Sequence, residues 1–159
     1  MTVVILVGLP GSGKSTYAAT KRLPVLSSDE IRKLLLDDVT DQSGNREVFE
    51  TLRSLLQQRL EFGRPLTCID ATSLTRSERR QYIRIAEAYG ANVEAVYLAA
   101  SLAVCKRRNR KRERVVPDDV MERMAAKLQP PEKREGFTRV TVLSATSVAR
   151  KARRAPAKA

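Results

Sequence analysis

The chain has 159 residues, of which 30 are lysine or arginine and 18 are aspartate or glutamate, and it has no histidine. A chain of this length is expected to form one domain with a sizeable core. The lack of histidine excludes histidine bases and histidine metal ligands from its chemistry. Two isolated cysteines and no long apolar stretch predict free thiols, a cytoplasmic location and no membrane partner.

The net charge of +12 is concentrated in two segments. Residues 106–114 contain seven cations and one acid, and residues 136–159 contain six cations and no acid. Positive charge gathered in this way points to a polyanionic partner. For residues 144–159 alone, a solvated basic tail without a specific partner is the alternative.

Strand and helix patterns alternate along the chain. Apolar runs typical of strands lie at 2–8, 24–27, 66–70, 93–99 and 138–143. The alternation predicts an α/β fold with a parallel sheet of about five strands and helices on both faces. We expect the folded domain to span residues 1–144. Residues 145–159 are rich in alanine, arginine, lysine and proline, which predicts a basic, disordered tail.

The helices between these strands have recognisable starts and stops. A first helical stretch follows at 17–22, and a long amphipathic helix is expected over 46–61. Residues 27–30 and 75–78 each fit an S/T-x-x-E capping box. Pro117 precedes two aspartates, which favours a further helix start there.

Residues 8–16 read G-L-P-G-S-G-K-S-T, which fits the phosphate-binding pattern G-x-x-x-x-G-K-[ST]. The loop follows an apolar strand and precedes a helical stretch, as phosphate binding requires. Its glycines allow backbone N–H groups to turn inward around a phosphate chain. The sequence therefore predicts a nucleoside triphosphate site. The residues expected to contact the nucleotide are Gly8, Pro10, Gly11, Ser12, Gly13, Lys14, Ser15 and Thr16.

A magnesium site is predicted beside this loop. Ser15 offers a hydroxyl to Mg²⁺, and Asp70 ends an apolar strand in the manner of a carboxylate that supports the ion. The alternative for Asp70 is an ordinary cap at the end of a strand.

Asp29 and Arg32 form a second candidate pair. They lie three residues apart at the start of a helix, so both project from one face, beside the edge of the sheet where ligands bind. The carboxylate could orient an acceptor hydroxyl and take its proton, and the guanidinium could hold an anionic group of the acceptor. An ion pair within a capped helix is the equal alternative.

The basic run at 106–114 is the third candidate feature. Arginines on a mobile lid can neutralise the charge that spreads over a transferred phosphoryl group. The run lies between a helical stretch that begins near Leu102 and the turn at 115–117, which suits a lid. The alternative is a charged helix face with a basic patch.

Taken together, these motifs resemble the kinase domain of polynucleotide kinases, the 5′-hydroxyl kinases of phage and bacterial nucleic-acid repair. The similarity covers residues 3 to about 143. Besides the phosphate loop, it is carried by L-S-S-D-E-I-R at 26–32, D-Q-S at 41–43, I-D-A-T at 69–72, R-R-N-R-K-R-E-R at 107–114 and R-E-G-F at 134–137.

The resemblance implies a P-loop kinase fold with an arginine-rich lid. It also implies ATP or another nucleoside triphosphate as donor, Mg²⁺ as cofactor and a nucleic-acid 5′-hydroxyl as acceptor. Asp29 then matches the general base, and Arg32 matches the clamp on the phosphate 3′ of the acceptor nucleotide. The other matching residues are Lys14 and Ser15 at the phosphates and Mg²⁺, Asp70 and Thr72 near the metal, and Arg108 and Arg112 in the lid, where they are expected at the nucleotide. Arg114 is a further lid candidate.

Two other functions stay open from the sequence. One is a small-molecule kinase that acts on a sugar or nucleoside. The other is a nucleotide-dependent nucleic-acid-binding module with little catalysis. The few aromatic residues fall mostly in core patterns, which favours an acceptor held by its phosphates rather than by base stacking.

Overall fold

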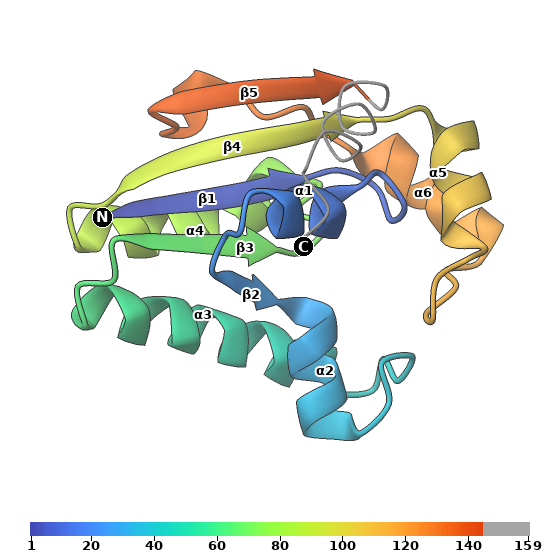
Figure 1. Cartoon of the computed structure of the whole chain (residues 1–159), viewed down its shortest axis with the longest axis horizontal. Coiled ribbons are helices and arrows are strands. Elements are labelled where there is room, and N and C mark those ends of the chain that lie inside the picture. The colour runs from blue at the N-terminus through green and yellow to red at the C-terminus, as the bar shows by residue number, and fades with distance from the viewer. Residues whose placement is uncertain (145–159) are drawn as a thin grey trace, which may run out of the picture.

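The computed structural model describes residues 1–144, which form a three-layer α/β domain (Figure 1). The predicted tail at 145–159 lies outside the described residues. Five parallel strands form one sheet in the order β2-β3-β1-β4-β5. The strands are β1 (Thr2–Val7), β2 (Val25–Ser27), β3 (Leu66–Asp70), β4 (Asn92–Ala99) and β5 (Arg139–Ser144). Each predicted strand end lies within one residue of the observed one, so the expected α/β fold is confirmed.

Six α-helices and one 3₁₀ turn connect and cover these strands. The helices are α1 (Lys14–Thr20), α2 (Ser28–Leu36), α3 (Asn45–Glu61), α4 (Arg76–Ala88), α5 (Leu102–Asn109) and α6 (Asp118–Lys127), and the turn is η1 (Lys133–Glu135). Within residues 1–144, no helix is long and apolar enough to cross a membrane.

Strand β1 lies at the centre of the sheet and is buried on both faces. Val3 and Ile5 pack into the larger core cluster, which also contains residues of α3 and α4. Val4 and Leu6 point to the opposite face, where Ala18 of α1 packs against them. This alternation follows from the two-residue period of a strand. Burial on both faces of the sheet explains the continuous apolar run before the phosphate loop.

The helix starts largely agree with the sequence patterns. Thr75 and Glu78 form a complete capping box at α4, and Ser27 accepts the N–H of Glu30 at α2. The first helix is a correction, because α1 begins at Lys14 rather than at residue 17. Gly13, with φ of +105°, reverses the chain immediately before it, so helical geometry starts inside the phosphate loop itself.

The carboxyl ends of all five strands lie at one edge of the sheet, because the strands are parallel. The loop after α2 and the loop between α5 and α6 lie beyond this edge, on the right in Figure 1. A separate apolar cluster supports α5 and α6 against the end of the phosphate loop. Its buried members are Leu9, Leu74, Cys105, Val116 and Met121.

Candidate active site

The phosphate loop joins β1 to α1 and lies against α5. Gly11 has φ of +80°, and a Cβ atom placed there would lie 2.5 Å from the carbonyl oxygen of Cys105. A side chain at this position would therefore both strain the backbone and push α5 away from the loop. Cys105 and Cys68 are buried free thiols, as expected.

Lys14 is held inside the curve of the loop. Its Nζ donates to the carbonyl oxygens of Gly8 at 2.8 Å and Leu9 at 2.9 Å. An ammonium group has three N–H donors, so one remains for a phosphate oxygen. Burial lowers the pKa of Lys14 from 10.5 to about 8, and the negative charge of Asp70 opposes that shift. An anion at the loop would favour the charged form further and raise this pKa.

Ser15 and Asp70 meet where β1 and β3 end side by side. The Ser15 hydroxyl donates to Oδ2 of Asp70 at 2.7 Å, across 55 residues of sequence. A hydroxyl and a carboxylate suit Mg²⁺, which takes oxygen ligands, uses few protein groups and keeps several waters. Within residues 1–144, no group of three or more acidic, cysteine or histidine side chains forms a metal cage. The pair thus fits a magnesium ion shared with phosphates.

Asp29 lies in the first turn of α2, beside the phosphate loop. Its Oδ1 accepts from Arg114 at 2.8 Å, and its Oδ2 accepts from Arg112 at 3.2 Å. Within the described residues, its ion pairs are with these two arginines rather than with Arg32. The alternative of an ion pair internal to the helix is therefore not the arrangement observed.

Arg32 projects from the same helix but is almost fully buried, with only 2% of its surface exposed. Its Nη1 donates to the carbonyl oxygen of Asp41 at 3.2 Å, whereas its Nε has no hydrogen-bond partner within residues 1–144. Burial and the nearby charge of Arg114 lower the pKa of Arg32. The carboxylate of Asp41 accepts the N–H of Ser43 at 2.8 Å, so the D-Q-S turn shapes the carbonyl that Arg32 contacts.

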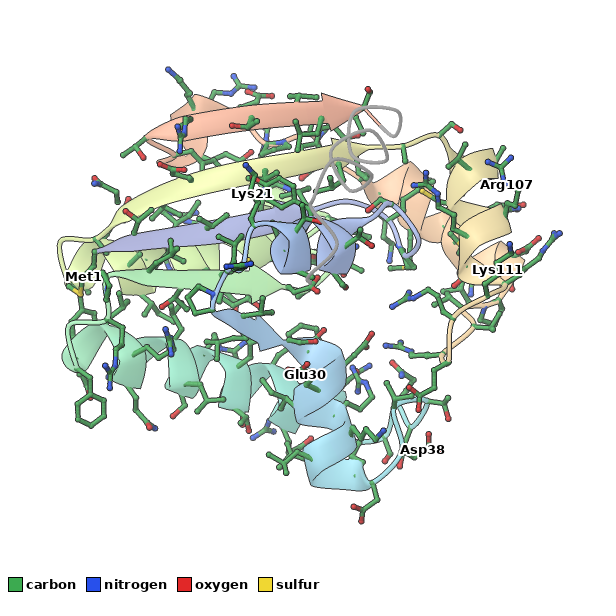
Figure 2. The ribbon with its side chains drawn as sticks, in the orientation of Figure 1. Met1, Lys21, Glu30, Asp38, Arg107 and Lys111 are labelled. Carbon is green, nitrogen blue, oxygen red and sulfur yellow. The ribbon has the colours of Figure 1, made fainter. Side chains whose placement is uncertain are left out.

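The basic run divides into two groups of side chains. Arg108, Arg112 and Arg114 line the cleft beside the loop. Arg107 and Lys111 point away from it, on the outer side of α5 and the following loop (Figure 2). The cations of the run are therefore not equivalent, and the three that line the cleft are those that the resemblance to polynucleotide kinases singles out.

Asn109 joins the two ends of the loop that carries Arg112 and Arg114. It is fully buried, and its amide donates to the carbonyl oxygen of Val116 at 2.7 Å and accepts the Val116 N–H at 3.1 Å. The loop is therefore pinched at its base, as a flap of six residues (110–115). The sequence gives no separate signal for Asn109, because it is a polar residue inside a charged run.

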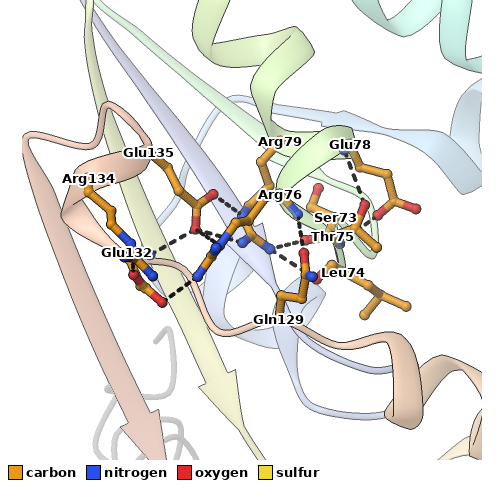
Figure 3. A network of polar contacts seen from close by, with 10 residues as sticks. All are labelled: Ser73, Leu74, Thr75, Arg76, Glu78, Arg79, Gln129, Glu132, Arg134 and Glu135. Carbon is orange, nitrogen blue, oxygen red and sulfur yellow. Dashed lines mark hydrogen bonds and ion pairs between the residues drawn. The ribbon is translucent and has the colours of Figure 1, made fainter.

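Arg79, which is fully buried on α4, holds the segment after β3 in place (Figure 3). The Arg79 guanidinium donates to both carboxylate oxygens of Glu135 at 2.8 Å and to the carbonyl oxygens of Ser73 and Leu74 at 3.0 Å. Ser73 has a positive φ of 48°, so this segment turns sharply directly after Asp70. Arg79 thus fixes the turn that follows Asp70, and Glu135 explains part of the R-E-G-F motif.

These parts surround a cleft of about 660 Å³ at the carboxyl edge of the sheet. Two predicted contacts, Gly8 and Ser12, do not line it. The Gly8 carbonyl supports Lys14 from inside the loop, and Ser12 is buried behind it with its N–H bonded to the Leu9 carbonyl. The predicted residues in the wall are Pro10, Gly11, Gly13, Lys14, Ser15, Thr16, Asp29, Arg32, Asp70, Thr72, Arg108, Arg112 and Arg114.

Ten further residues of the wall were not predicted as site residues, and they include polar and apolar side chains. Gln42 belongs to the D-Q-S motif, and it accepts a hydrogen bond from Asn45 at 3.1 Å. Phe49 matches the apolar pattern of α3, and its ring is shared between the core and the cleft. Val120 and Met124 of α6 supply an apolar side. The motifs at 26–32, 41–43 and 69–72 could have located part of this wall, because they contain Ser27, Ser28, Gln42 and Ala71.

Comparisons with known proteins agree with this architecture. The family described as "AAA domain" (AAA_33) matches residues 3–131. An L-seryl-tRNA(Sec) kinase of Methanococcus maripaludis is 29% identical over 138 residues, which are 81% of this chain and 53% of that protein. The chain therefore spans about half the length of this curated relative.

Two solved structures share the fold at lower identity. A chain of the Pnkp1/Rnl/Hen1 RNA repair complex has a TM-score of 0.68 and 23% identity, and the match covers 80% of this chain and 44% of that one. A sugar kinase from Janibacter sp. HTCC2649 has a TM-score of 0.65 and 22% identity, and the match covers 96% of this chain and 90% of that one. These comparisons support the expected enzyme class, an ATP-dependent kinase. By its match over residues 3–131 and by its structure, the chain belongs to the AAA_33 family and has the fold of the P-loop kinases.

Proposed function

We propose that this domain transfers the terminal phosphoryl group of ATP to the 5′-hydroxyl of a nucleic acid. The observation that carries the proposal is the state of Arg32. Arg32 lies in the wall of the cleft with 2% of its residue surface exposed, and its buried Nε donor has no partner within residues 1–144. A buried charged donor left unpaired is costly, and an anionic group on the acceptor would satisfy it.

The position of Arg32 relative to Asp29 favours a phosphodiester acceptor. The two side chains project from one face of α2, three residues apart, and both line the cleft. In a nucleic acid, one sugar separates the terminal 5′-hydroxyl from the first phosphate. A carboxylate for the hydroxyl and a guanidinium for that phosphate can therefore engage the same nucleotide. A neutral sugar would leave Arg32 unpaired.

In the reaction we propose, Asp29 accepts the proton of the 5′-hydroxyl as its oxygen attacks the terminal phosphorus of ATP. The new bond joins that oxygen to the phosphorus, and the bond to the bridging oxygen breaks, which releases ADP. Lys14 holds the phosphate chain, and the lid arginines neutralise the charge on the transferred group. Mg²⁺ held at Ser15 and Asp70 would supply further neutralisation of the phosphates.

The names of the relatives agree with an acceptor attached to nucleic acid, because one is an L-seryl-tRNA(Sec) kinase and another belongs to an RNA repair complex. A neighbour named as a sugar kinase has the same fold, which keeps the small-molecule alternative as the comparison to test. The buried guanidinium favours the nucleic acid over the sugar.

Transfer from labelled ATP in the presence of Mg²⁺ tests the proposal. The acceptors are 5′-hydroxyl oligonucleotides of DNA and RNA, a seryl-tRNA, and a panel of sugars and nucleosides. We expect label at the 5′ end of an oligonucleotide. Label confined to the sugars, to nucleosides or to the seryl group would contradict the proposal. Binding of ATP and oligonucleotide without any transfer would indicate a binding module.

Asp29→Asn separates the chemical step from binding. We expect it to abolish transfer while the affinity for ATP changes little, because the phosphate loop is untouched. Asp37→Asn is the matched control, since Asp37 is an exposed carboxylate at the end of the same helix and its φ of 57° suits asparagine.

A further inference from the structure

A second cleft, of about 370 Å³, adjoins the first one between α3, α4 and the segment after β3. The two clefts share four wall residues, which are Phe49, Ala71, Thr72 and Glu78. The second cleft is therefore a continuation of the first. An acceptor longer than one nucleotide would extend into it.

Arg53 brings to the wall of this second cleft a positive charge that forms no ion pair within residues 1–144. It is half-buried, and its side chain has no hydrogen bond or ion pair within residues 1–144. The phenol of Tyr82 is its electrostatic neighbour, but burial raises the pKa of Tyr82 to about 12, so the phenol is neutral at physiological pH. Glu78, the acid of this wall, accepts the N–H of Thr75 at 3.0 Å in the capping box.

Arg46 lies two helical turns before Arg53 and also lines the second cleft. Its Nε bonds Glu50 at 2.9 Å, and most of its side chain is exposed. Its charge is therefore balanced locally and screened by solvent. This leaves Arg53 as the stronger attraction for an anion in this cleft.

Phe49 lies between these arginines on α3 and contributes to both clefts. It is half-buried, so part of its ring faces the cleft. Proteins that bind single strands place bases on aromatic rings and phosphates at cations. An aromatic ring next to an unpaired guanidinium is such a combination, and it adds base stacking to the phosphate contacts expected from the sequence.

Resting on the proposed function, we infer that the second cleft binds the second nucleotide of the acceptor strand. The base of that nucleotide packs against Phe49, and the phosphate on its 3′ side pairs with Arg53. Successive phosphates of the strand then meet Arg32 and Arg53 in order. The preferred substrate class is a nucleic-acid strand of two or more nucleotides, rather than a nucleoside phosphate.

A comparison of two acceptors tests this inference. One is a nucleoside 3′-monophosphate, which reaches Arg32 alone, and the other is a dinucleotide that also carries a 3′-phosphate. For the unmodified protein, we expect kcat/KM to be about tenfold higher with the dinucleotide, since it gains a charge-assisted hydrogen bond. Arg53→Gln should bring this ratio close to one, and Phe49→Leu should lower it several-fold.

Arg84→Gln is the control, because Arg84 is exposed on α4 and lines neither cleft. It should keep the tenfold ratio, and circular dichroism should show the same fold for all variants. The second subsite would be overturned if the kcat/KM ratio stayed at tenfold in Arg53→Gln, or if it were near one in the unmodified protein. Either result would leave the proposed function intact. Absence of transfer to both acceptors would overturn the proposed function and this inference together.

Discussion

Asp29 Oδ1 and Arg114 Nη1 lie 2.8 Å apart although 85 residues separate them in the sequence. The contact joins the helix that follows β2 to the flap between α5 and α6. Arg112 makes a second contact with the same carboxylate at 3.2 Å. The group proposed to receive the acceptor proton and the arginines proposed to stabilise the transferred phosphoryl group are therefore already adjacent.

The flap arginines are expected to act mainly on the chemical step. Arg112→Gln should lower kcat by about 10³-fold or more, because a positioned arginine stabilises the charge of the transition state. Its effect on the affinity for ATP should be much smaller. Steady-state kinetics with saturating ATP and acceptor measure the change in kcat.

Arg110→Gln is the control for this prediction. Arg110 is exposed, pairs with Asp118 at 3.4 Å and does not line the cleft. It should change kcat less than about twofold, in keeping with a surface ion pair. Equal losses of kcat in Arg112→Gln and Arg110→Gln would show that only the overall charge of the flap matters.

The affinity for ATP should fall as pH rises through about 8. Burial lowers the pKa of Lys14 to about 8, so the free protein loses the positive charge of this side chain above that pH. Bound phosphates favour the charged form, so binding must take up a proton there, and the affinity weakens with rising pH. Calorimetric titrations with ATP between pH 7 and 10 measure the effect.

Two lysine variants check the source of this pH dependence. Lys14→Met should bind ATP weakly and with little change between pH 7 and 10. Lys21→Met removes an exposed lysine and should retain the full dependence. A flat profile for the unmodified protein would refute the role assigned to the buried ammonium.

Loss of Arg79 should destabilise the whole domain. Arg79→Met leaves the carboxylate of Glu135, whose side chain is only 7% exposed, without its guanidinium, and breaking a buried ion pair costs about 3–5 kcal/mol. Urea unfolding gives the free energy of unfolding. Arg76→Met removes a partly exposed arginine that pairs with Glu132 at 2.6 Å and has only a long contact of 3.9 Å with Glu135, so it should cost less than about 1 kcal/mol. Similar losses in the free energy of unfolding for Arg79→Met and Arg76→Met would argue against the importance of burying the ion pair.

Gly11→Ala should disrupt the phosphate loop. The new Cβ would lie 2.5 Å from the Cys105 carbonyl oxygen, and φ is +80°, so both steric overlap and backbone strain act against it. Gly63 has a similar φ of +63°, but a Cβ atom placed there would have no other atom within 4 Å. Gly63→Ala should therefore lower the free energy of unfolding by about 1–2 kcal/mol, through backbone strain alone. Unfolding titrations should show a larger loss of stability for Gly11→Ala than for Gly63→Ala. ATP titrations should show a loss of binding only for Gly11→Ala.

Local patterns predicted the fold well because strands and helices alternate clearly. The apolar period of β1, the capping residues and the glycines of the phosphate loop each depend on neighbours in sequence. These local signals also placed Lys14, Ser15 and Asp70, since strand ends in a parallel sheet meet at one edge. The start of α1 was predicted three residues late, because Gly13 allows the helix to begin within the loop.

Contacts between distant segments could not be predicted in the same way. Arg32 depends on a carbonyl group in the turn at 41–43, and the pair of Arg79 and Glu135 spans 56 residues. The flap that carries Arg112 and Arg114 is closed by the contact between Asn109 and Val116, which is a pairing that no local pattern predicts. Phe49 fits the apolar face of α3, so its share in the cleft wall follows only from the packing of α3 beside the first cleft.

The partnership of Arg79 with Glu135 has a consequence for where this domain can be shortened. The family match stops at residue 131, four positions before the carboxylate that neutralises Arg79. A fragment that ends at that point would lack Glu135 and the edge strand β5. The buried guanidinium of Arg79 would then have no counter-charge behind the turn that follows Asp70. The smallest piece that folds should therefore reach past residue 135, whatever the sequence family alone suggests.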